Sequence, residues 1–354
     1  MSILKDCPQT AARIICHIFN NMIRTGIYPE KLKTSKVIPI LKNGKPATDK
    51  SSYCPICILP TVDKIIESIL KDQLEKYFEG NKLIPNQHHG GRKNHSTITA
   101  MAAIDINHKT FKEKKNTVAV MTTDLSAAFD LVDHNLLIEK LKFYGLQNEA
   151  CTLLENFLKD RKVYTQIQGF NSDIQAAQPC SVIQGSKLSG FLFTLFSIEI
   201  PLIPKLMRNA QLIELLMEIK IPQFYGVLHE VNQYVDDSTN LIGSNTKEEM
   251  EKYLESYHKV IETYYSANKL KINSDKTQLI ITRKKWKDKT DEKVKFKTKE
   301  GDTISEVNAL RVLGFIKNNC DSYDSHLGQV NGRVVKTLAE LKPYTEHIYR
   351  TLWL

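Results

Sequence analysis

The chain has 354 residues, of which 42% are hydrophobic and 25% are charged, and its formal net charge is +9. This composition predicts a globular protein of two to three domains and excludes an intrinsically disordered chain. The sequence contains no run of eighteen apolar residues, and its N-terminus lacks the apolar centre of a secretory signal. We therefore expect an intracellular protein that does not bind membranes.

The excess of basic residues is uneven along the chain. Residues 283–299 hold nine basic side chains against three acidic ones. A basic surface favours polyanions through phosphate contacts and counterion release, whereas a solvated face is the alternative for this run taken alone. The seven cysteines are scattered, and the pair Cys54 and Cys57 has no second pair at a zinc-site spacing. We therefore expect reduced thiols and no zinc.

The first half of the chain predicts helices and short strands separated by polar loops. Helical periodicity predicts helices over residues 8–26, 62–78, 97–111, 134–144 and 149–158. Apolar or β-branched runs predict strands over residues 37–41, 117–125 and 162–169. Ser96 and Asp133 are expected to cap the third and fourth of these helices. Gly90 and Gly91 break any pattern in the loop before Ser96.

The second half of the chain continues the alternation. A Gln-Gly-Ser turn opens an apolar helix, and after a region rich in Leu, Ile and Lys two strands flank the sequence QYVDDSTN. A helix over residues 248–267, a strand over 276–283 and a hairpin around 300–302 follow, and the last apolar stretch covers 309–316. The sequence shows no internal repeat, so a repeat architecture is not expected.

Three carboxylates stand at the ends of predicted core strands. Asp124 ends one strand, and Asp236 and Asp237 lie side by side at the bend between two others. Adjacent carboxylates repel each other, and hard cations such as Mg²⁺ prefer such oxygens, so a two-metal phosphoryl-transfer site would explain the pair. A solvent-facing acidic turn is the alternative for the pair alone. Asp130 and Asp133 are expected to be a surface acid and a cap.

Several motifs occur in the order found in one family. They are MTTDLSAAFDLVDH, SVIQGSKLSGFLFTL, QYVDDST, ANKLKINSDKT and LRVLGF, preceded by SKVIPILKNGKPATDKSSYCPICILPTVDKIIE and LIPNQHHGGRKNHST. Together they resemble the reverse transcriptases, and specifically those of non-LTR (LINE-type) retrotransposons of the jockey-like kind. The resemblance covers nearly the whole chain, and several motifs in order are far more specific than any one of them.

The resemblance implies a metal site and an acid catalyst. Asp124, Asp236 and Asp237 would hold two Mg²⁺ ions, with Mn²⁺ as a substitute and with Asp124 and Asp236 as the principal ligands. Val235 would lie beneath them as an apolar support. Lys276 matches the lysine thought to protonate the departing pyrophosphate, although a surface lysine is the alternative.

The resemblance also implies nucleotide and template contacts. Phe129 matches the position whose ring blocks a ribose 2′-OH, with an ordinary core residue as the alternative. Gln184 and Gly185 match the turn that packs on the nascent base pair and template, where the missing side chain lets a backbone approach. The basic candidates for contacts with the triphosphate or the template backbone are Arg92, Lys42 and Lys45. The expected primer-grip hairpin contains Leu313 and Gly314.

The implied fold is α+β, a right-hand polymerase with fingers, a palm built on an antiparallel sheet, and a partial thumb. The expected boundaries are residues 1–115 for the fingers, 116–145 for the first palm block, 146–177 for a connection, 178–304 for the main palm, and 305–354 for the primer grip and partial thumb. The expected partners are an RNA template, a DNA primer and deoxynucleoside triphosphates. A retrotransposon ribonucleoprotein would occur in the nucleus and cytoplasm.

Two departures from the family pattern leave alternatives open. The fingers motif commonly carries an arginine where this chain has Cys54, and a cysteine cannot replace a guanidinium fork on a triphosphate. The chain also begins within the expected fingers and ends within the expected thumb. One alternative is therefore a decayed or co-opted fragment that binds nucleic acid without catalysis. Another is an RNA-dependent RNA polymerase, which Phe129 and Val235 disfavour.

Overall fold

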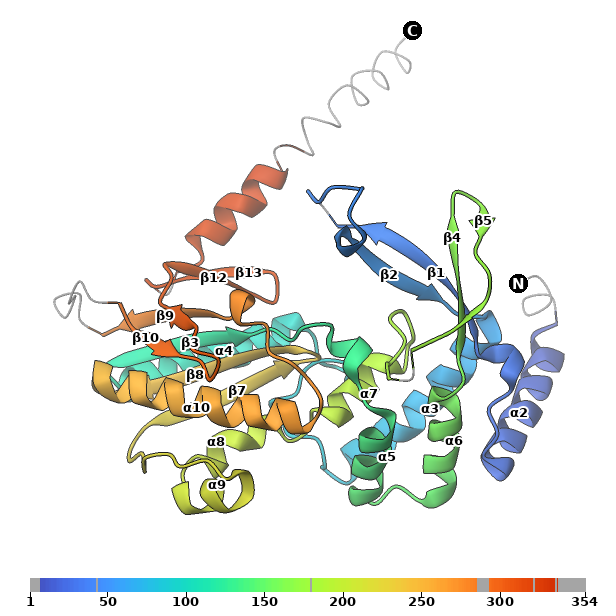
Figure 1. The fold of residues 1–354 in the computed structure, drawn as a ribbon, viewed down its shortest axis with the longest axis horizontal. Coiled ribbons are helices and arrows are strands. Elements are labelled where there is room, and N and C mark those ends of the chain that lie inside the picture. The colour runs from blue at the N-terminus through green and yellow to red at the C-terminus, as the bar shows by residue number, and fades with distance from the viewer. Residues whose placement is uncertain are drawn as a thin grey trace, which may run out of the picture.

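Two β-sheets with their helices lie side by side in the protein. The computed structural model describes residues 7–42, 44–178, 180–284, 293–320, 322–334 and 336. In Figure 1 the first sheet, with α4 and α10, occupies the left half, and the second sheet, with α2, α3, α5 and α6, occupies the right half. We call them the central sheet and the outer sheet.

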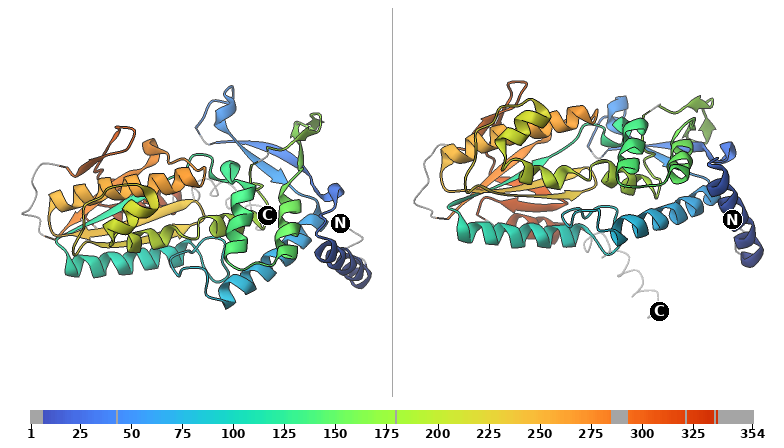
Figure 2. Two further views of the ribbon diagram at one scale, coloured as in Figure 1. Left: turned by 60° about the horizontal axis from the view of Figure 1, so that its bottom comes forward. Right: turned by 90° about the horizontal axis from the view of Figure 1, so that it is seen from below.

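The central sheet is antiparallel, with the strand order β7–β8–β3–β9. Its strands are β3 (Thr117–Thr123), β7 (Leu228–Tyr234), β8 (Asp237–Ser244) and β9 (Gln278–Arg283). Helices α4 (Thr97–Lys114) and α10 (Lys247–Ala267) cover its opposite faces (Figure 2). Along β3, Val118 and Val120 belong to the apolar cluster on the α4 side, and Ala119 and Met121 to the cluster on the α10 side. Because helices cover both faces of the sheet, successive side chains of β3 from Val118 to Met121 are all apolar.

The outer sheet has five strands in the described part of the chain. They are β1 (Thr34–Leu41), β2 (Tyr53–Ile58), β4 (Lys162–Ile167), β5 (Phe170–Asn171) and β6 (Gln175–Ala176). Strand β1 pairs antiparallel with β2 and parallel with β4. The helices at its base are α2 (Pro8–Thr25), α3 (Thr61–Gly80), α5 (His134–Phe143) and α6 (Asn148–Leu158). The loop end of the β1–β2 hairpin lies on the opposite side of the sheet from these helices and projects away from them (Figure 1).

The segment that joins β6 to β7 along the chain is strongly apolar. It contains α7 (Ser189–Phe196), α8 (Ile203–Leu206) and α9 (Ala210–Met217). Phe191, Phe193 and Phe196 are fully buried. The stretch Ser189–Leu206 is long and apolar enough to cross a membrane, but 72% of it is buried inside the fold, as expected for a core segment of a globular protein.

Two hairpins complete the described structure. The first is β10 (Lys295–Lys297) with β11 (Thr303–Ser305), and the second is β12 (Ala309–Val312) with β13 (Phe315–Asn318). Lys317 in β13 donates a hydrogen bond to Asp105 of α4 at 3.0 Å, and the hydroxyl of Tyr323 donates to the same carboxylate. The β12–β13 hairpin is thereby attached to the helix that covers the central sheet. Residues 324–334 are helical. The short 3₁₀ turns of the chain are Glu30–Leu32, Lys50–Ser52, Ala128–Leu131, Ile200–Leu202 and Ser274–Lys276.

The predicted elements agree with the structure in type and order. Ser96 and Asp133 cap α4 and α5, and Gly26 ends α2 with a left-handed φ of 66°. Helices α8 and α9 were not predicted, although the Asn209 side chain caps α9. Helix α4, which the expected boundary at residue 115 assigns to the fingers, packs on the central sheet. The domain boundaries stay predictions. Residues 285–292 of the basic run, and the expected thumb segment from residue 337 on, lie outside the described residues.

Candidate nucleic-acid polymerase site

The acidic pair occupies a tight turn between β7 and β8. Tyr234 pairs with Asp237, so the loop consists of Val235 and Asp236. Val235 has a left-handed φ of 57°, which is a strained conformation for a β-branched residue. The side-chain amide of Gln233 donates a hydrogen bond to the Val235 carbonyl at 2.8 Å. The turn is therefore held in an unfavourable backbone conformation by its surroundings.

Gly90 packs directly against the acidic turn. An added Cβ at Gly90 would lie 2.2 Å from the Val235 nitrogen, a distance that no side chain tolerates. The loop that contains Gly90 is hydrogen-bonded to the end of β7, because the His89 amide donates to the Gln233 carbonyl at 2.8 Å and the Gln233 amide donates to the Gln87 carbonyl at 2.9 Å. Sequence reasoning recognised Gly90 only as a pattern breaker. Its role depends on this long-range contact.

Asp124 and Lys276 are brought together by main-chain pairing. The Asn273 amide donates to the Asp124 carbonyl at 2.9 Å, and the Ser126 amide donates to the Lys271 carbonyl at the same distance. This pairing extends β3 beyond its last assigned residue. The ammonium Nζ of Lys276 then lies 2.9 Å from Oδ2 of Asp124. The structure thus places two of the predicted catalytic residues in direct contact.

The three carboxylates influence one another electrostatically. Burial, together with the charge of Asp124, raises the pKa of Asp236. Loss of hydration in the site and then the charges of Asp236 and Asp124 raise the pKa of Asp237 to about 6. Lys276 opposes both effects. The site concentrates negative charge that a cation would relieve.

The donor chemistry of these carboxylates fits a hard divalent cation. In the described part of the chain, no group of three or more His, Cys, Asp or Glu side chains is arranged so that it could hold a metal ion. Instead the Lys276 ammonium contacts Asp124, while burial and then the charges of Asp236 and Asp124 raise the pKa of Asp237. Carboxylate oxygens with mutual repulsion are the ligands that Mg²⁺ and Mn²⁺ use in phosphoryl-transfer sites. Asp124, Asp236 and Asp237 therefore remain the predicted ligand set.

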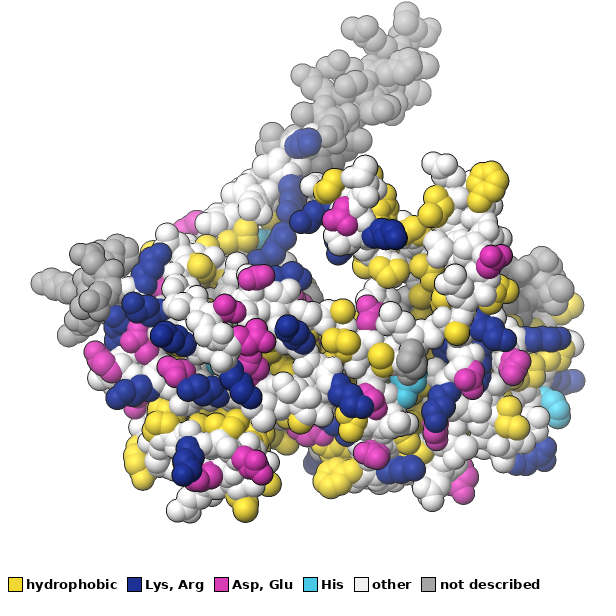
Figure 3. Space-filling model, in the orientation of Figure 1, with side chains coloured by type: hydrophobic (Ala, Val, Ile, Leu, Met, Phe, Trp, Pro, Cys, Tyr) yellow, Lys and Arg dark blue, Asp and Glu magenta, His cyan; other side chains and the backbone are white. Residues whose placement is uncertain are grey.

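An open groove of about 550 Å³ passes over these residues. Asp124, Asp237 and Lys276 line one side. The turn of the β12–β13 hairpin, with Leu313 and Gly314 at left-handed φ values of 48° and 88°, lines another. This is the predicted primer-grip hairpin, and the structure places it beside the carboxylates. In Figure 3 the surface is hollowed between the C-terminal helix and the β1–β2 end, and Lys and Arg side chains gather on both walls.

Phe129 lies in the 3₁₀ turn Ala128–Leu131, which follows Asp124 in the chain. It is half-buried, and its ring stacks on Phe193 with centroids 5.4 Å apart. The Val182 amide donates to the Phe129 carbonyl at 2.8 Å, which links the segment after Asp124 to the segment before Gln184. Both the predicted role in nucleotide selection and the alternative of a packing residue are compatible with a ring that is partly exposed.

The Gln184–Gly185 turn packs on β2. The Cys57 amide donates to the Gln184 carbonyl at 2.8 Å, and an added Cβ at Gly185 would lie 2.4 Å from the Cys57 carbonyl oxygen. Gly185 has φ 107°, a conformation that L side chains rarely adopt. Cys54 also contacts this turn, with Sγ 3.7 Å from Oε1 of Gln184. The position where the family carries arginine is therefore adjacent to the predicted template turn.

The predicted basic contacts are not brought to the carboxylates. Arg92 is buried and directed toward Glu79 at the end of α3, with an Nε–Oε1 distance of 2.6 Å. Lys42 and Lys45 lie exposed after β1, and Lys42 donates to the Ser51 carbonyl at 3.0 Å. The role predicted for Arg92 at the triphosphate therefore has no support in the geometry. Lys42 and Lys45 stay predictions for the projecting end of the outer sheet.

None of the seven cysteines, all of which are described, forms a disulfide in the structure. Cys54 and Cys57 both belong to β2, and the structure groups no further cysteine or histidine with them as a metal site within the described residues.

Comparisons with known proteins define the family. A sequence profile of the reverse transcriptase (RNA-dependent DNA polymerase) family matches residues 40–316. A probable RNA-directed DNA polymerase from transposon BS of Drosophila melanogaster is 27% identical over 77% of this chain, and the RNA-directed DNA polymerase from mobile element jockey of the same species is 29% identical over 55%. These matches cover 28% and 21% of the relatives, so the chain spans about a quarter of their length.

A likeness to solved structures supports the fold. An apo telomerase from Candida tropicalis superposes with a TM-score of 0.51 at 12% identity, over 89% of this chain and 53% of the telomerase. A complex of that telomerase with a fragment of telomeric RNA gives the same TM-score over 84% and 46%. The expected α+β right-hand polymerase fold is confirmed. With its acidic motifs inside the matched residues 40–316, the chain belongs to the reverse transcriptase (RNA-dependent DNA polymerase) family.

Proposed function

We propose that this chain is the RNA-directed DNA polymerase domain of a non-LTR retrotransposon. It would add deoxynucleotides to the 3′-OH of a DNA primer on an RNA template. The observation that carries the proposal is the convergence of Asp124, Asp237 and Lys276 at one open groove. Asp236 stands beside them, electrostatically coupled to Asp237. The polymerases from transposon BS and jockey, to which the chain is similar, support the same reaction.

The carboxylates would hold divalent cations, Mg²⁺ in our proposal with Mn²⁺ as a substitute. Such ions, when bound, supply Lewis-acid stabilisation of phosphoryl oxygens. The residues of the chain itself orient the reactants. Lys276 holds an ammonium proton beside Asp124 and would donate one to the departing pyrophosphate. Before catalysis, the Lys276–Asp124 contact also neutralises part of the negative charge of the site.

The nucleic acid would lie in the hollow between the two sheets. Arg311 lines the groove on the primer-grip side, and Lys42 and Lys45 lie at the far end of the outer sheet. These cations would contact backbone phosphates, and binding should weaken as salt increases. For a retrotransposon ribonucleoprotein we propose a location in the nucleus and cytoplasm.

Primer extension on an RNA template tests the proposal, with deoxynucleotides and ribonucleotides supplied in separate reactions. Extension with deoxynucleotides and divalent cation is expected, and omission of the cation should abolish it. Preferential use of ribonucleotides would favour an RNA polymerase. Duplex binding without any extension would favour a binding module that has lost catalysis, a reading to which Cys54 already points.

Replacement of Phe129 by Ala is expected to raise kcat/KM for ribonucleotides, relative to that for deoxynucleotides, by about tenfold. A tenfold change corresponds to the loss of a steric clash that costs ~1.4 kcal/mol. The reason is that the ring would no longer exclude the 2′-OH. The measurement is the ratio of kcat/KM for the two nucleotides.

The control is Phe193→Leu, which removes the ring on which Phe129 stacks and leaves the Phe129 side chain itself unchanged. An unchanged ratio in Phe129→Ala, or the same change in both variants, would mean that Phe129 acts only through packing.

A further inference from the structure

Arg92 is engaged at every guanidinium nitrogen. Nε and Nη2 donate to the two carboxylate oxygens of Glu79 at 2.6 and 2.7 Å. Nη1 donates to the carbonyls of Pro85 and His88 at 3.0 and 2.6 Å. The side chain of Arg92 is 5% exposed, so it cannot reach a substrate without breaking this arrangement. Arg92 instead joins the end of α3 to the loop that follows it.

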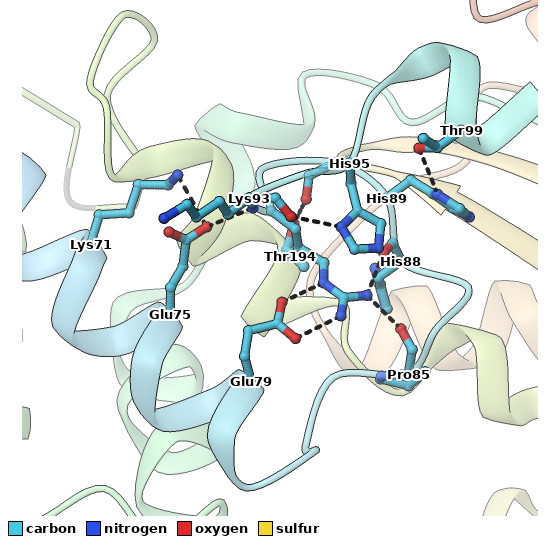
Figure 4. Close-up of polar contacts among 12 residues, drawn as sticks. Lys71, Glu75, Glu79, Pro85, His88, His89, Lys93, His95, Thr99 and Thr194 are labelled. Carbon is cyan, nitrogen blue, oxygen red and sulfur yellow. Dashed lines mark hydrogen bonds and ion pairs between the residues drawn. The ribbon is translucent and has the colours of Figure 1, made fainter.

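The same loop holds the acidic turn. His88, whose carbonyl accepts from Arg92, precedes His89 and Gly90, which contact Gln233 and Val235. Figure 4 shows Glu79 on α3 facing the loop that carries Pro85, His88 and His89. Two hydrogen bonds therefore link the Arg92 guanidinium to the strand that leads into the turn. One runs from Arg92 to the His88 carbonyl, and the other runs from the His89 amide to the Gln233 carbonyl.

Other contacts complete the attachment of the loop. The hydroxyl of Thr194 in α7 donates to the Gly90 carbonyl at 3.0 Å, and the Lys93 amide donates to Glu75 of α3 at 3.2 Å. These are single hydrogen bonds. The Arg92–Glu79 fork is bidentate and charged on both sides, which makes it the stronger kind of contact, and it lowers the pKa of Glu79.

We propose that Arg92 is a positioning residue for the acidic turn. By fixing residues 85–91 it keeps Val235 in the left-handed conformation, and with it the directions of Asp236 and Asp237. A strained backbone conformation persists only where contacts with the surrounding structure hold it in place. The ion pair between Arg92 and Glu79 is the charged contact that fixes this surrounding loop. The inference rests on the proposed polymerase function for its catalytic consequence, although the structural coupling can be measured without catalysis.

The test uses Arg92→Met and Glu79→Gln, each of which removes the fork while retaining side-chain length. The matched control is Lys140→Met, because Lys140 is a partly buried cation that also donates to a carboxylate, Glu199, and to a main-chain carbonyl, that of Phe196. Two readouts are taken from each protein. One is the kcat and KM for deoxynucleotide incorporation together with primer–template affinity, and the other is hydrogen exchange in peptides that cover residues 228–240.

The expected result is a fall in kcat of about tenfold or more for Arg92→Met, because misplacement by ~1 Å costs up to ~100-fold. KM and duplex affinity should stay near the wild-type values. Exchange in residues 228–240 should become faster in Arg92→Met and Glu79→Gln but not in Lys140→Met.

Unchanged exchange in both fork variants, or an equal change in Lys140→Met, would overturn the proposal. If Arg92→Met does not fold, the milder Glu79→Gln decides by the same criteria, since Glu79 is partly exposed. If the wild-type chain does not extend primers, the proposed function fails, whereas the exchange readout still supports or overturns the coupling.

Discussion

Asp236→Asn is expected to lower kcat for primer extension by ~10³-fold or more, the scale of losing a central electrostatic group in a phosphoryl-transfer site. Asparagine keeps the shape of the side chain but removes the negative charge that a divalent cation needs. Affinity for an RNA/DNA duplex should change little, because the groove and its basic walls remain. Single-turnover extension in Mg²⁺ and duplex binding at one salt concentration measure the two quantities.

The control for this prediction is Asp130→Asn. Asp130 lies six residues after Asp124 in the same motif, and burial raises the pKa of its carboxyl, yet it has no place among the three coupled carboxylates. Its replacement should leave extension close to that of the wild type. Normal extension by Asp236→Asn would remove Asp236 from the metal site.

The same substitution should affect stability in the opposite direction. Burial and the charge of Asp124 raise the pKa of Asp236, so its ionised form is less favourable in the folded state than in the unfolded one. The free energy of unfolding therefore decreases in the wild type as pH rises from the ordinary aspartate pKa through the raised one, and the neutral amide of the variant avoids this loss. Thermal unfolding of the metal-free proteins at pH 4 and pH 8 should show the variant gaining on the wild type at the higher pH. A variant that loses activity but gains stability shows that the replaced carboxylate serves function, because replacement of a structural carboxylate would lower the stability of the fold.

The sequence predicted those parts of the site that local chemistry determines. Asp124 follows a strongly apolar strand, and Asp236 and Asp237 interrupt two others, so their places at strand ends follow from periodicity alone. Their proximity to one another depends on sheet order, which the sequence pattern does not encode. It was available only through the resemblance to a family whose motifs occur in the same order.

Arg92 shows where such reasoning stops. An arginine in a polar loop has the same sequence signature whether it points to solvent or to a carboxylate. Its partner Glu79 lies thirteen residues earlier, and the two meet only because the loop turns back past the end of α3. Gly90 is similar, since its need for a missing side chain arises from Val235, far away in the sequence. Both residues act through contacts that the folded structure brings together and that the local sequence does not indicate.

The last prediction concerns Gly185 and the turn on β2. In Gly185→Ala the new Cβ would lie 2.4 Å from the Cys57 carbonyl oxygen, and φ 107° would itself be unfavourable. The turn must move away from β2 and lose the hydrogen bond from the Cys57 amide to Gln184, which is 2.8 Å long in the wild type. A shift of this size is expected to lower kcat/KM for extension by ~10–100-fold if the turn contacts the template and the nascent base pair.

Gly301→Ala separates the clash from the backbone strain. Gly301 also has a positive φ, 94°, but nothing lies within 4 Å of the position that its Cβ would occupy. Both variants therefore incur a similar conformational cost, and only Gly185→Ala displaces a neighbouring main chain. Extension on one RNA template, measured together with the melting temperature, compares the two. Equal activity in the two variants, with similar losses of stability, would mean that the Gln184–Gly185 turn does not contact the substrate. A selective loss in Gly185→Ala would place the template against the edge of β2, next to Cys54, where the family usually carries an arginine.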